Sequence, residues 1–105
     1  MAWVYLLVAG LLEIVWASAM KQSHGFTRAV PTAIMVVTML GSFSLLALAM
    51  RTLPLGTAYM IWTGIGAIGA FMIGIWLFGE QTSLMRICAA ALIASGMILM
   101  KMSGE

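Results

Sequence analysis

The chain contains four apolar runs that are long enough, or nearly long enough, to cross a lipid bilayer. A bilayer core is about 30 Å thick, so a spanning helix needs about 20 mainly apolar residues. The runs expected to cross are residues 2–20, 32–50, 57–78 and 87–100. The last run is short, and it reaches across if Arg86 and Lys101 extend their side chains to opposite interfaces. We therefore predict an all-α integral membrane protein, with four transmembrane helices in a single domain over residues 1–105.

The composition excludes an additional soluble domain. Of the 105 residues, 64% are hydrophobic and only 8% are charged, whereas a soluble domain is roughly one quarter charged. The Lys and Arg residues are scattered singly near the ends of the runs, which argues against nucleic acid as a partner. His24 has no second His or Cys at metal-ligand spacing, and no nucleophile is paired with a base. We expect no enzymatic activity, no cofactor and no metal site.

The basic residues are almost evenly divided between the two sides of the membrane. The first and third loops carry Lys21, Arg28 and Arg86, and the opposite side carries Arg51 and Lys101. Because Lys and Arg in short loops orient a membrane protein, this small bias predicts insertion in both orientations and pairing of antiparallel copies. A single orientation and a heterodimer with a paralogue both stay open.

Glu13 is the only charged residue within the four runs. A charge at the centre of a spanning helix costs on the order of 2.5–3.5 kcal/mol and marks a functional site by default. Gly10 and Trp16 share its helical face, which leaves space beside the carboxylate and offers an indole N–H. Ser42, in the second run, has a hydroxyl suited either to this carboxylate or to its own helix backbone.

The third run carries aromatic residues and glycines on one helical stripe. Tyr59 and Trp62 lie toward one end of the stripe, and Gly66 and Gly69 toward the other. Aromatic rings beside missing side chains suit a partly open pocket. Glycine-rich faces also serve close helix packing in membranes, and the two interpretations are compatible.

Three segments together resemble the small multidrug resistance family of proton-coupled exporters: "LLEIVWASAMK", "GFTRAVP" and "LPLGTAYMIWTGIGAIGA". Trp16, three residues after Glu13, and the "WTGIG" at residues 62–66 are similar to the guanidinium-exporter subtype. The resemblance implies an antiparallel, dual-topology homodimer in the bacterial inner membrane. It also implies export of guanidinium and small substituted guanidinium cations in exchange for protons by alternating access.

The resemblance assigns roles to individual residues. Glu13 would be shared by substrate and protons, Trp16 and Ser42 would hydrogen-bond it, and Tyr59 would change partner during exchange. The implied substrate and proton site comprises Gly10, Glu13, Trp16, Ser42, Tyr59 and Trp62. The implied hinge is Gly64, Ile65 and Gly66. The implied dimer contact on the fourth helix includes Ala89, Ala90, Ala94 and Gly96.

The predicted pocket lining departs from the family pattern. Met60 stands where many guanidinium exporters have Ala, and Met39 and Phe43 add bulk near the pocket, which Thr63 also lines. Methionine adapts to ligands of different shape, so a broad-specificity exporter of quaternary ammonium cations is the main competing interpretation. Two further functions stay possible on the same residues: a cation or proton channel, and a structural subunit that would tolerate Glu13→Gln.

Overall fold

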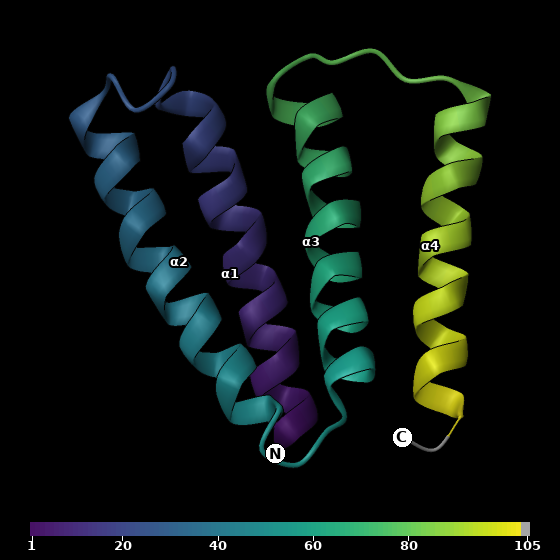
Figure 1. The fold of residues 1–105 in the computed structure, drawn as a ribbon. Helices are drawn as coiled ribbons and strands as arrows, with labels where there is room; N and C mark the ends of the chain where they lie inside the picture. Colours follow the sequence, from purple (N-terminus) through teal and green to yellow (C-terminus); the bar gives the residue numbers. More distant parts are fainter. Residues whose placement is uncertain (104–105) are drawn as a thin grey trace.

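The protein forms four antiparallel helices joined by short loops. The computed structural model describes residues 1–103, so the last two residues of the predicted domain lie outside the described part. The helices are α1 (Ala2–Gln22), α2 (Ala29–Ala49), α3 (Leu55–Leu77) and α4 (Leu84–Met102). In Figure 1 they stand side by side in the order α2, α1, α3, α4, with the start of α1 and the end of α4 at the same end of the bundle. Each helix is long and apolar enough to cross a membrane.

The fourth helix extends beyond the apolar run that predicted it. It has 19 residues and includes Arg86 and Lys101. At about 1.5 Å per residue it is about 28 Å long, close to the thickness of a bilayer core. Its start is fixed by Ser83, whose hydroxyl accepts a hydrogen bond from the Arg86 backbone N–H at 3.3 Å. The helix thus includes polar residues that bound the apolar run, because backbone hydrogen bonding continues through them.

Helix α1 is the centre of the bundle, because it packs against both α2 and α3, whereas α4 packs against α3. The core cluster combines small and large apolar side chains: Leu6, Ala9, Leu46, Ala49, Ala58, Ile61 and Trp62. The alanines allow the helix backbones to approach closely, as is common in membranes. Helix α4 has no buried residue in the described chain. One side of the bundle therefore ends in a helix whose apolar surface is largely exposed.

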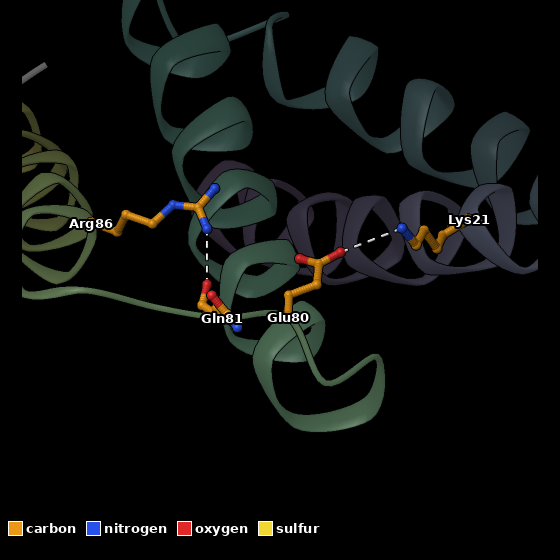
Figure 2. Close-up of polar contacts among 4 residues, drawn as sticks. All are labelled: Lys21, Glu80, Gln81 and Arg86. Atoms are coloured by element: carbon orange, nitrogen blue, oxygen red, sulfur yellow. Dashed lines mark hydrogen bonds and ion pairs between the residues drawn. The ribbon is translucent and has the colours of Figure 1, made fainter.

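Polar contacts hold the α3–α4 loop against the end of α1. Glu80 forms a salt bridge with Lys21, with Oε2 and Nζ 3.5 Å apart, and its backbone N–H donates to the Gly74 carbonyl at 3.0 Å. The Arg86 guanidinium donates to the Gln81 carbonyl at 2.8 Å. Figure 2 shows the Glu80 and Lys21 side chains pointing toward one another. Because both are substantially exposed, this pair positions the loop and contributes little stability.

Candidate functional site

The Glu13 carboxyl lies in the interface between α1 and α3, directly against Gly66. A Cβ atom built at Gly66 would overlap the carboxyl group, so the space that Glu13 occupies exists because residue 66 has no side chain. Glu13 Oε1 is buried and has no hydrogen-bond partner among residues 1–103. Buried polar atoms are nearly always hydrogen-bonded, and the exceptions call for an explanation. An unpartnered acceptor inside an apolar bundle is a natural site for a ligand with hydrogen-bond donors.

The three residues predicted as a hinge each meet a different neighbour. The missing side chain of Gly64 accommodates Met97 of α4, and Ile65 packs on Gly10 of α1. Gly66 meets Glu13, as described above. Helix α3 is continuous through this segment. Within this short segment α3 contacts both α1 and α4, and its role as a hinge stays a prediction.

Four aromatic side chains from three helices form a row beside this interface. The ring centroids of Trp16 and Phe43 lie 6.3 Å apart, those of Phe43 and Trp62 5.7 Å apart, and those of Trp62 and Tyr59 5.6 Å apart. The first two pairs meet edge to face, a favoured geometry. Trp62 is buried, whereas Phe43 and Tyr59 are 45% and 52% exposed in the single chain. The row thus presents an open aromatic surface.

Ser42 has different partners from those implied by the family resemblance. Its hydroxyl donates to the Ala9 carbonyl at 2.7 Å and accepts from Trp62 Nε1 at 2.9 Å. A hydroxyl has one hydrogen, so Ser42 cannot donate to Glu13 while it donates to Ala9. The bond instead ties α2 to the turn of α1 that precedes Glu13 and fixes the Trp62 ring. Trp16 Nε1, the other implied partner of Glu13, is buried and unpaired among residues 1–103.

The acceptor role of Ala9 was not predicted. A main-chain carbonyl carries no sequence signal, and only the rotation of α2 about its axis brings Ser42 to it. The remaining predicted pocket residues lie at the surface of the single chain: Met60 and Thr63 are exposed, and Met39 is half-buried. Their contribution to a pocket stays a prediction.

The predicted dimer-contact residues of α4 differ in burial within the single chain. Ala90 and Ala94 are half-buried, and both Ala89 and Ala90 line a hollow at the junction with α3. Ala89 and Gly96 are exposed, and a Cβ atom at Gly96 would meet nothing within 4 Å. Ala90, Ala94 and Met97 follow helical spacing on the side of α4 that faces α3. The small residues of α4 therefore serve packing within one chain as well as any contact with a second one.

Comparison with known proteins identifies one family and a set of relatives that share one name. Residues 1–93 match the family described as Small Multidrug Resistance protein. This protein belongs to that family. It is 52% identical over 103 residues to proteins named guanidinium exporter from Citrobacter freundii, Salmonella typhimurium and Escherichia coli K12, with 98% of each chain covered. As a member of the Small Multidrug Resistance (SMR) family with four spanning helices, it is a multi-pass membrane protein and a transporter.

The Ser42–Trp62 hydrogen bond of this SMR protein gives a stability prediction. Ser42→Ala leaves the buried Trp62 N–H without an acceptor, which should lower the free energy of unfolding by about 1–3 kcal/mol. Ser44→Ala is the matched control, because the exposed Ser44 hydroxyl bonds only to the Leu40 carbonyl of its own helix. It should change stability by less than about 0.5 kcal/mol. Unfolding in mixed micelles measures both variants, and equal losses would contradict a special role for Ser42.

Proposed function

We propose that this SMR protein exports guanidinium and small substituted guanidinium cations in exchange for protons. The observation that carries the proposal is the buried Glu13 oxygen, which has no hydrogen-bond partner among residues 1–103 and lies in an apolar interface. The names of the relatives at 52% identity support the choice of guanidinium as substrate. The expected location is the bacterial inner membrane, since the relatives come from enteric bacteria.

Guanidinium matches the chemistry of this site. It is a planar cation whose N–H groups pair with a carboxylate through two parallel hydrogen bonds. Its flat faces also interact favourably with Trp and Tyr rings, and Trp62 and Tyr59 form part of the aromatic row. In this proposal, Glu13 supplies the charge and the acceptor oxygens, and the row selects a small flat ion.

Competition for Glu13 couples the cation to protons. A protonated carboxyl carries no charge and has lost one acceptor position, so it binds guanidinium poorly. By linkage, cation binding expels the proton, and protonation releases the cation. Guanidinium affinity should therefore fall as the pH falls. A proton gradient directed into the cell then drives the cation out.

In this proposal, an antiparallel pair of copies provides alternating access. Helix α4 has no buried residue in the described chain, and its exposed side chains include Leu92 and Leu99, which a second copy would cover. Phe43 and Tyr59 leave the aromatic row open on one side, where the partner would complete the pocket. Two Glu13 carboxylates in one low-dielectric cavity disfavour joint ionisation, which favours proton uptake when the cation leaves. Co-expression of differently tagged copies separates a homodimer from a heterodimer with a paralogue.

A broad-specificity exporter of quaternary ammonium cations is the second candidate. Met60 is 56% exposed and Phe43 is 45% exposed, so apolar side chains, one of them a flexible methionine, border the open side of the site. Such side chains accept bulky alkyl groups. A quaternary ammonium ion has no N–H, however, and would leave the Glu13 oxygen without a hydrogen bond.

Transport currents in proteoliposomes distinguish the two candidates. Guanidinium and methylguanidinium should each evoke a current, and tetrapropylammonium should give less than about a tenth of it, because losing a charge-assisted hydrogen bond costs about 1.5–3 kcal/mol. Similar currents from all three cations would make the protein a multidrug exporter. Guanidinium flux that does not drive proton flux would indicate a channel.

A further inference from the structure

A second concave site lies away from Glu13, between α1, α3 and α4. The groove has a volume of about 510 Å³, which is in the range of ligand pockets. Trp3, in the first turn of α1, and Lys101, in the last turn of α4, lie together at one end of the groove. Its apolar lining includes Val4, Leu7, Ile61, Ile65, Met97 and Ile98.

The groove and the aromatic row occupy different faces of α3. Ile61 and Ile65 line the groove, and each precedes by one residue a member of the Glu13 site, Trp62 or Gly66. One residue along a helix corresponds to a rotation of about 100°. The groove lining includes neither Glu13 nor Trp62 nor Gly66, so the groove is distinct from the proposed transport site.

Among residues 1–103, the groups at the polar end of the groove carry positive charge only. The Lys101 ammonium lies 5.1 Å from the centroid of the Trp3 ring and has no carboxylate within salt-bridge distance among residues 1–103. Arg51 and the N-terminal amine lie at the same end of the bundle. The two carboxylates of the described chain are elsewhere, since Glu13 is in the middle of α1 and Glu80 pairs with Lys21 at the opposite end. An anionic ligand is therefore favoured here.

We propose that this groove binds an anionic phospholipid, with one acyl chain between α1 and α4 and the phosphate at Lys101. The lining is apolar along the length of the groove, and the single cation lies at the end of α4, where the membrane interface is expected. Basic residues between spanning helices bind anionic headgroups, and a Trp such as Trp3 is typical of the interface. Charge complementarity separates this occupant from a neutral lipid.

Native mass spectrometry of the full chain, with phosphatidylglycerol or phosphatidylcholine of matched acyl chains, tests the proposal. The wild type should retain phosphatidylglycerol preferentially. Lys101→Gln should weaken phosphatidylglycerol binding about fivefold, as expected for one basic residue at a membrane surface, and should leave phosphatidylcholine unchanged. Val4→Trp, which fills the groove beside α1, should weaken the binding of both lipids.

Arg51→Gln is the matched control, because it removes the same charge from the same end of the bundle but lies outside the groove lining. It should leave phosphatidylglycerol binding within roughly twofold of the wild type, in contrast to Lys101→Gln. Equal losses in Arg51→Gln and Lys101→Gln would overturn the site in favour of diffuse surface charge. Unchanged lipid binding in Val4→Trp, with a shifted monomer–dimer equilibrium, would overturn it in favour of a second copy in the groove.

Discussion

Glu13→Gln is expected to abolish guanidinium transport while the four helices stay folded. Glutamine has nearly the same shape but cannot carry the charge that balances the cation. Removing one partner of a buried charge pair costs about 2–5 kcal/mol, which corresponds to a loss of about 30-fold to several thousand-fold in affinity. The fold should persist, because the variant removes a buried charge that has no protein partner in the described chain.

Currents in proteoliposomes and guanidinium binding by tryptophan fluorescence measure this loss. Wild-type binding should weaken as the pH falls, whereas residual binding to Glu13→Gln should not depend on pH. Glu80→Gln is the control, since it removes a carboxylate from an exposed loop, where the pair with Lys21 contributes little. Transport by Glu13→Gln at wild-type levels would contradict the proposed exchange and would leave the carboxylate with a structural role.

Gly66→Ala should reduce guanidinium affinity strongly with little effect on the fold. The added methyl carbon would lie 2.7 Å from Glu13 Cγ and would overlap the carboxyl group. Because this group is the far end of a flexible side chain, it should rotate away while α1 and α3 keep their spacing. A displacement of about 1 Å of a positioned reacting group costs on the order of a hundredfold in enzymes. We therefore expect guanidinium binding to weaken by at least about tenfold.

Binding and unfolding measured on the same preparations separate this effect from a general loss of packing. Gly56→Ala is the matched control on the same helix, because a Cβ atom there meets nothing within 4 Å. Gly10→Ala provides the opposite case: its Cβ would lie 2.8 Å from the Cβ of Ile65, next to the backbone, so stability should fall. Wild-type affinity in Gly66→Ala would show that the position of the carboxyl seen here is not the one that binds the cation.

The four helices were predictable, but their ends were not. Hydropathy placed the second run at residues 32–50 and the fourth at 87–100, whereas α2 is Ala29–Ala49 and α4 is Leu84–Met102. Hydropathy reports which residues favour lipid, and a helix ends where its backbone hydrogen bonds end. Pro31 within the first turn of α2 and Ser83 before α4 mark where the backbone hydrogen bonds of a helix begin, and they say nothing about preference for lipid.

Among the candidate site residues, only Glu13 was conspicuous without knowledge of how the helices pack. A carboxylate within an apolar run indicates a functional residue whatever the fold, so the sequence alone identified Glu13. The sequence did not show that Ser42 bonds to the Ala9 carbonyl and Trp62, because a hydroxyl in a spanning helix has several possible partners. It also did not show that Ala89 and Ala90 of α4 line a hollow against α3, since that depends on where α3 lies.

The sequence by itself determined that this protein crosses a membrane four times and carries one carboxylate within those crossings. Both are local properties, because the transfer of a helix into lipid depends on its own side chains. Only the tertiary structure decided that Glu13 lies on Gly66, that Ser42 holds Trp62, and that a groove ends at Lys101. These facts depend on the rotation and register of each helix, which in lipid are set by close contacts between residues distant in the chain.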